Sequence, residues 1–266
     1  MNYLIPAGRI FFAFAFIGLG IEHFIFQDFI TGRAPAWPEA VPGRILWAYL
    51  TGVFFIAISI AIITGMRARY AAVSAGVLIF FWALLRQIPV AATDSLFAAT
   101  WTTAGKALTF FGGAFAIAAT LPGEYKIRNA SYLKFMNRSS EFITLGRICM
   151  GIFLIVTGVQ HFLFTEFVAS LIPGWFPGDA GFWTWFGGVA LIAGGIGLLI
   201  SKTAKWAALL SGIMVFSWFW IIHIPRTFFS TSDGIAVFEA LAVSGICFVI
   251  AGFLYDQEKN RLNRNI

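Results

Sequence analysis

The chain has 266 residues, of which 59% are hydrophobic and only 11% are charged, and its formal net charge is +6. A soluble domain carries about 25% charged residues, so this composition excludes an ordinary soluble protein and indicates an integral membrane protein. The basic excess does not predict nucleic-acid binding, because the Lys and Arg residues gather at the ends of apolar runs, as in membrane proteins. The lipid bilayer is therefore the expected partner, and no nucleic acid is.

Eight apolar runs are long enough, or nearly so, to cross a bilayer as helices of about 20 residues. They cover residues 6–25, 45–65, 69–88, 103–121, 143–163, 183–200, 205–223 and 234–254. Basic residues fall mainly on one side of these runs and acidic residues mainly on the other. Because Lys and Arg resist translocation, we expect eight spans in the inner (plasma) membrane of a bacterium, with both termini in the cytoplasm.

The sequence contains an internal repeat. Residues 8–29 and 146–167 agree at nine of 22 positions when they are shifted by 138, and one match is a histidine. Residues 71–89 and 207–225 agree at seven of 19 positions. Each copy holds four spans, an even number, so both copies should have the same orientation. We expect an all-α fold of two parallel four-helix repeats related by a pseudo-twofold axis along the membrane normal.

The repeat also predicts how the chain is divided. A first four-helix unit and a second one are separated by a basic cytoplasmic linker and followed by a cytoplasmic tail. Their expected bounds are 1–122 for the first unit, 123–142 for the linker, 143–255 for the second unit and 256–266 for the tail.

Nine polar side chains lie within or at the ends of spans, where apolar residues would be sufficient to cross the membrane. They are Glu22, His23, Arg86, Gln87, Lys106, Gln160, His161, His223 and Glu239. An unpaired charge in hydrocarbon costs several kcal/mol, so such residues usually face a partner or a wet cavity. The expected topology puts all nine in the outer third of the membrane. We predict that they line a polar ligand-binding pocket in the outer leaflet.

Two matched positions sharpen this prediction. Lys106 and Glu239 align at a shift of 133, so a pseudo-twofold axis would place opposite charges at the same depth, where they could form an ion pair. Gly20 and Gly158 each lie three residues before a repeated histidine. A glycine there either lets another helix backbone approach or leaves a hollow beside the imidazole.

The histidines allow four interpretations. Each could be an interfacial imidazole bonded to a backbone carbonyl or to Glu22, or a proton donor and acceptor beside a quinone-like small molecule. His23, His161 and His223 could together bind zinc or copper, although the sequence has no local metal motif. A haem held between two histidines is the fourth interpretation, and no haem motif is present either.

The repeated motifs resemble those of DoxX-like membrane proteins. Each unit opens with Gly-Arg-Ile, continues with Gly-x2-His-Phe and closes its third helix with Phe-x-Trp before Ile-Pro, and Glu239 opens a Glu-Ala-Leu-Ala run. The resemblance covers residues 5–255 as two fused four-helix units, and Lys106 departs from it. It implies a link with quinone-reducing thiosulfate dehydrogenase subunits and with membrane-associated redox and oxidative-stress complexes.

These observations lead us to expect a membrane subunit of a redox system that binds a quinone or a similar small molecule and works with a redox partner protein. The Glu22 and histidine side chains would exchange protons with the ligand, and the Arg and Gln side chains would orient it. Lys106 and Glu239 would set the local field. A small-solute transporter or permease, and a non-catalytic scaffold for a partner enzyme, remain as alternatives. The electron donor, the electron acceptor and intrinsic catalysis stay open.

Overall fold

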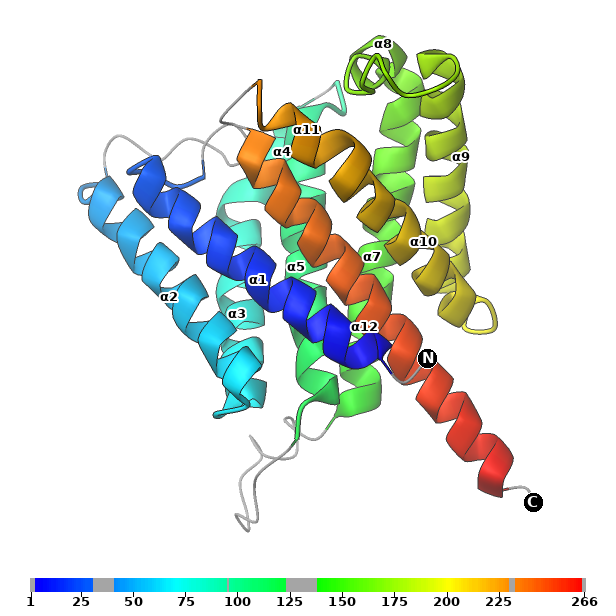
Figure 1. The fold of residues 1–266 in the computed structure, drawn as a ribbon. Helices are drawn as coiled ribbons and strands as arrows, with labels where there is room; N and C mark the ends of the chain where they lie inside the picture. The colour runs from blue at the N-terminus through cyan, green and yellow to red at the C-terminus, as the bar shows by residue number, and fades with distance from the viewer. Residues whose placement is uncertain (1–2, 31–40, 95, 123–137, 230–232, 265–266) are drawn as a thin grey trace.

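The computed structural model describes residues 3–30, 41–94, 96–122, 138–229 and 233–264, and these residues form helices and turns with no strand among them (Figure 1). The π-helical segments η1 (Ala83–Gln87) and η2 (Phe219–His223) interrupt two of the helical runs. In chain order the helices are α1 (Leu4–Ile25), α2 (Arg44–Thr64), α3 (Ala68–Trp82), α4 (Ile88–Thr93), α5 (Ala99–Thr120), α7 (Ser139–Leu163), α8 (Thr165–Ala169), α9 (Ala180–Leu199), α10 (Ala204–Trp218), α11 (Ile224–Arg226) and α12 (Gly234–Arg264).

Seven helical runs within the described residues are long and apolar enough to cross a membrane. They are α1, α2, α3 through α4, α7, α9, α10 through α11, and α12. The described residues therefore confirm the predicted all-helical class, and the length and composition of these seven runs suit a membrane protein. The remaining predicted run is α5, a helix of 22 residues whose first half carries Thr100, Thr102, Thr103 and Lys106.

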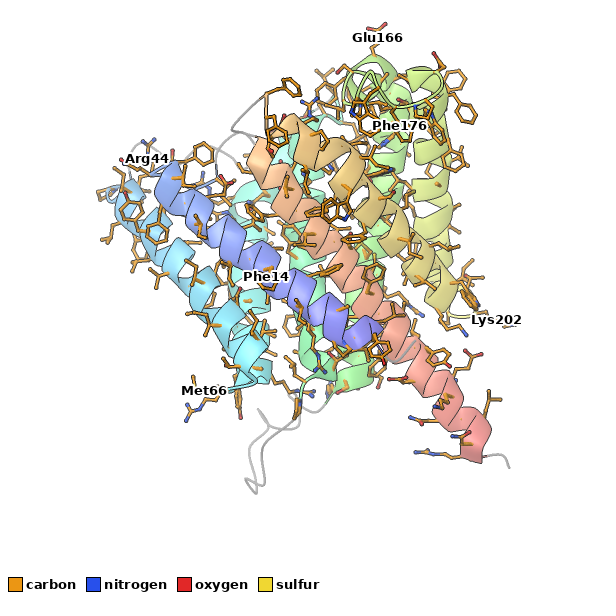
Figure 2. The ribbon with its side chains drawn as sticks, viewed as in Figure 1. Phe14, Arg44, Met66, Glu166, Phe176 and Lys202 are labelled. Atoms are coloured by element: carbon orange, nitrogen blue, oxygen red, sulfur yellow. The ribbon has the colours of Figure 1, made fainter. Side chains whose placement is uncertain are left out.

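The two ends of the bundle carry different residues. Both termini lie at the lower end in Figure 1, which we call the terminal end. Met66 and Lys202 lie at this end in Figure 2, whereas Arg44, Glu166 and Phe176 lie at the opposite end. The helices α1 and α7 finish at that opposite end with His23 and His161 in their last turns, so we call it the histidine end.

Two expected boundaries differ at the terminal end. The last apolar run was expected to stop at residue 254, but α12 continues to Arg264, so most of the predicted tail is helical. The predicted linker, residues 123–142, lies mostly outside the described residues, and α7 already begins within it at Ser139.

The first helix of each predicted unit packs against the last helix of the other predicted unit. α1 packs on α2 and on α12, while α7 packs on α9 and on α5. Glycines allow both crossings: a Cβ added to Gly8 would lie 2.4 Å from the Gly245 carbonyl oxygen, and one added to Gly146 would lie 2.8 Å from that of Gly112. Since α5 also contacts α12, these two helices join the copies through the middle of the bundle.

The glycines before the two histidines permit a close helix approach. A Cβ added to Gly20 would lie 2.8 Å from the carbonyl oxygen of Gly52 on α2, and one added to Gly158 would lie 2.8 Å from that of Gly188 on α9. Ordinary side-chain carbons never come so near a backbone, so the first of the two interpretations of these glycines is confirmed. The result is that α2 and α9 pack directly against the histidine-bearing turns.

The π-helical segments extend two helices past their predicted ends. The corresponding apolar runs were expected to end at residues 88 and 223, each within two residues of a proline, a residue that usually stops a helix because it lacks the N–H. This prediction is wrong: α3 passes through η1 into α4, and α10 passes through η2 into α11. In both runs the proline falls in the first turn after the π segment, where its missing N–H costs little.

Candidate ligand-binding site at the histidine end

His23 is sealed inside the first copy. Its Nδ1 lies 2.7 Å from the Leu19 carbonyl oxygen, which can only accept, so Nδ1 carries the hydrogen and the neutral ring presents Nε2 as an acceptor. The residue is 3% exposed. Phe29 and Phe55 meet the ring edge-on, with centroids 6.1 and 5.8 Å away. An aromatic lining thus surrounds the first imidazole.

Arg86 and Gln87 hold a tryptophan in this lining. The Trp82 ring stacks on Phe29 with centroids 4.7 Å apart. With its amide nitrogen facing the Trp82 carbonyl, Gln87 donates to that oxygen over 2.6 Å and accepts from Trp82 Nε1 over 3.0 Å. The Arg86 guanidinium lies 5.2 Å above the same ring, a cation–π distance. Two of the three side chains that were predicted to orient a ligand therefore contact Trp82.

The side chain of Glu22, a residue of α1, lies beside the first residue of α12. The carboxylate is buried, and its Oε1 is 2.8 Å from the place where a Cβ on Gly234 would be. Gly234 is the first residue of α12, and a helix N-terminus stabilises a nearby carboxylate. This proximity to the start of α12 distinguishes Glu22 from Gln160, the residue at the matched position of the second copy.

Lys106 and Glu239 form the predicted ion pair. Lys106 Nζ lies 2.6 Å from Glu239 Oε2, and the two side chains are only 19% and 10% exposed. Lys106 belongs to α5 and Glu239 to α12, so the pair joins the two copies. A short, charge-assisted hydrogen bond of this kind offsets part of the cost of burying both charges.

His161 repeats the hydrogen bond of His23 in a more open setting. Its Nδ1 lies 2.7 Å from the Thr157 carbonyl oxygen, so its Nε2 is again the acceptor. The Trp218 ring is nearly parallel to it at a centroid distance of 6.1 Å. His161 is only partly buried, in contrast to His23.

Gln160 and His223 complete the second copy. The Gln160 amide nitrogen donates to the carbonyl oxygens of Phe97 and Ala98 over 2.8 and 2.9 Å, and its oxygen accepts from Thr102 Oγ1 over 2.7 Å. These bonds use both amide hydrogens and tie α7 to the start of α5. His223 is the partly buried last residue of η2, at the position that corresponds to Gln87.

The nine predicted residues fall into three groups. Glu22, His23, Arg86 and Gln87 belong to the first copy, and Gln160, His161 and His223 to the second, while Lys106 and Glu239 join the copies. Within the described part of the chain, no three His, Cys, Asp or Glu side chains are grouped so that they could hold a metal ion. The interpretation of the three histidines as one zinc or copper site is therefore wrong.

A cavity of about 330 Å³ lies at the terminal end, so it is not the predicted outer pocket. Its lining comes from α1, α5 and α12 and consists of Ile5, Ala119, Thr120, Phe253, Asp256, Gln257 and Asn260. Arg9 Nε donates to Thr120 Oγ1 over 3.0 Å beside it. Ile5 lies at the opposite end of α1 from His23, so this cavity and the histidines are separate features.

The sequence reasoning missed the aromatic partners of the histidines. Phe29 meets the first imidazole edge-on and Trp82 stacks on Phe29, while Trp218 lies nearly parallel to the second imidazole. All three occur at repeat positions where both copies carry the same residue, Phe29 with Phe167 and Trp82 with Trp218. The identity of the two copies at these positions was the signal available in the sequence, but it is equally consistent with ordinary packing.

Comparison with protein families adds one match. Residues 150–236, from the middle of α7 to the beginning of α12, match the model of a family described as a domain of unknown function (DUF8561). Comparison with curated proteins and with solved structures found no match. The matched region contains Gln160, His161 and His223.

Proposed function

We propose that the chain spans a bacterial inner membrane eight times as two parallel, DoxX-like four-helix units related by a pseudo-twofold axis along the membrane normal. The matched glycine crossings support the symmetry, as do the two π segments at corresponding positions. With its 22 residues, α5 is about 33 Å long, enough for the eighth span. Arg9, Arg69, Arg147 and Lys205 all lie near the terminal end, which favours cytoplasmic termini.

We propose that this protein is the membrane subunit of a redox system and binds a quinone or its quinol at the histidine end. The observation that carries the proposal is the shared hydrogen bond of His23 and His161. In each ring Nδ1–H is held by a backbone carbonyl at 2.7 Å, so Nε2 is the nitrogen that can exchange a proton. Aromatic side chains flank both rings and suit a flat apolar ligand.

The other polar residues support this role. Glu22 and His223 extend the set of groups that can exchange protons. Arg86 and Gln87 fix Trp82, Gln160 fixes the start of α5, and the Lys106–Glu239 pair sets the local field. When a quinol is oxidised it releases two protons and two electrons. We assign proton exchange to this chain and the two electrons to a redox partner protein.

Equilibrium dialysis of the purified protein in detergent, with ubiquinone-1 and ubiquinol-1 as probes, tests the proposal. We expect saturable binding of at least one probe, and at least a tenfold loss of affinity in the double variant His23→Phe, His161→Phe. Lys202→Ala, at the opposite end, is the matched control and should bind like the wild type. A wild-type protein that binds neither probe would overturn the proposal.

A proton-coupled transporter is the second candidate, favoured by one observation. The π segments η1 and η2 interrupt corresponding helices, and such interruptions recur at functional sites and in the broken helices of transporters. Pyranine fluorescence inside proteoliposomes would report proton flux. Flux that is present in the wild type and lost in Glu239→Gln would favour transport over quinone binding.

A further inference from the structure

The two copies differ at one position beside the histidine. Thr51 of α2 corresponds to Gly187 of α9. A Cβ added to Gly187 would lie 3.7 Å from His161 Nε2 and 3.4 Å from Trp218 Cζ2. No side chain from position 187 therefore covers the nitrogen that accepts hydrogen bonds. In the first copy a threonine stands at this position, its hydroxyl donating to the Trp47 carbonyl over 2.8 Å.

The two copies also differ at a second matched position, that of Phe29 and Phe167. Phe29 is 7% exposed and lies between His23 and Trp82, touching the first ring edge-on and stacking on the second. Its counterpart Phe167 belongs to α8 and is 65% exposed. In the second copy the Trp218 ring lies nearly parallel to His161, with centroids 6.1 Å apart. Phe29 thus helps to enclose His23, whereas its counterpart Phe167 is exposed and position 187 beside His161 has no side chain.

The approach to His161 is apolar. Phe162 and Phe186, the immediate sequence neighbours of His161 and Gly187, are 43% and 55% exposed, and Trp185, two residues before Gly187, is 58% exposed. A ligand that reaches Nε2 along this face would therefore arrive from the lipid phase. An aromatic ring on an isoprenoid tail has the required character.

We infer that the ligand binds at the second copy alone, over Gly187, and that it presents a hydroxyl hydrogen to His161 Nε2. This inference rests on the proposed function and narrows it. Since Nδ1–H is engaged by Thr157, the neutral ring offers only an acceptor at Nε2. A quinol hydroxyl can donate to that acceptor, whereas a quinone carbonyl cannot. The site should therefore prefer the reduced ring, and His23 should serve the packing of the first copy.

Substitutions at position 187 test the inference, because they leave the imidazole in place. Gly187→Ala meets no atom closer than 3.4 Å, so this variant should fold. Gly187→Thr reproduces the residue of the first copy. We expect the wild type to bind ubiquinol-1 at least tenfold more tightly than ubiquinone-1. Gly187→Thr should lose at least tenfold in ubiquinol-1 affinity, and Gly187→Ala should lose less.

The matched control is Thr51→Ala in the first copy, which should bind ubiquinol-1 within twofold of the wild type. Size-exclusion chromatography and thermal unfolding would show that each variant folds. If Gly187→Thr folds and binds ubiquinol-1 normally, or if ubiquinone-1 binds as tightly as ubiquinol-1, the inference is wrong while the proposed function stands. If the wild type binds neither probe, the proposed function itself has failed.

Discussion

His23 and His161 make the same hydrogen bond to the carbonyl four residues earlier, yet His23 is buried and His161 is only partly buried. The first copy encloses its histidine with Phe29. The second copy leaves Phe167 exposed and has a glycine at position 187. This difference indicates that the shared glycines preserve the helix packing of both copies. A few side chains at the histidine end then determine which copy can bind a ligand.

The largest effect is expected where the copies carry opposite charges. Lys106→Met leaves the Glu239 carboxylate without this ammonium group in a largely buried setting. Removing one partner of a buried pair costs about 3–5 kcal/mol, and thermal unfolding in detergent should show the loss. The double variant Lys106→Glu, Glu239→Lys exchanges the charges and should recover most of the stability.

A control pair lies at the terminal end. Lys205 pairs with Glu258, whose side chain is 55% exposed, so Lys205→Met should cost less than about 1 kcal/mol. If Lys106→Met is equally mild, the pair between the copies does not stabilise the bundle, and the account of how α5 and α12 join the copies is wrong.

The next largest difference should separate the two matched phenylalanines. Phe29→Ala removes a buried ring that contacts His23 and Trp82, and such truncations cost about 3–5 kcal/mol. Phe167→Ala removes an exposed ring and should change the unfolding free energy by no more than about 0.5 kcal/mol. Chemical unfolding of the two variants measures both values, and equal losses would contradict the described asymmetry.

The smallest effect concerns the loop before α5. Asp94 accepts hydrogen bonds from the Thr100 hydroxyl and from the Leu96 and Ala98 backbone N–H groups, and these bonds hold the pKa of its carboxyl below the usual range. A lowered pKa stabilises the fold above the usual carboxyl pKa, and this contribution disappears as the pH falls below about 4.

Replacing this carboxylate should therefore reduce the pH dependence. When the pH is lowered from 6 to 3, the melting temperature of Asp94→Asn should fall by less than that of the wild type. Asp233, at the corresponding place before α12, instead forms an ion pair with Arg226 at 3.2 Å. Identical pH profiles for the wild type and Asp94→Asn would show that the hydrogen bonds of Asp94 do not stabilise the loop.

Much of the fold follows from the sequence. The apolar runs predicted the helices to within a few residues at most ends, and the shift of 133 correctly paired Lys106 with Glu239. The packing of α1 on α12 and of α5 on α7 could not be predicted. A repeat shows which residues correspond, but the same glycines would suit a crossing within a copy or between copies.

The details of the candidate site were less predictable. Phe29 and Phe167 are matched phenylalanines in the sequence, but Phe29 follows the end of α1 outside a helix, whereas Phe167 lies in α8. Gly187 carries no signal of its own, because a glycine in a span usually reports helix packing. The helix that continues past Pro89 also escaped prediction, since a π segment absorbs the break that proline usually makes.

Photolabelling tests the central claim most directly. An azido-ubiquinone, reduced to the quinol in the sample and activated by light, would attach to the side chains nearest its ring, and mass spectrometry would locate them. The account predicts labelling of α7, α9 and α10 close to His161, Gly187 and Trp218, suppressed by an excess of ubiquinol-1. Suppressible labelling close to His23, Phe29 and Trp82 instead, or labelling that ubiquinol-1 does not suppress, would contradict it.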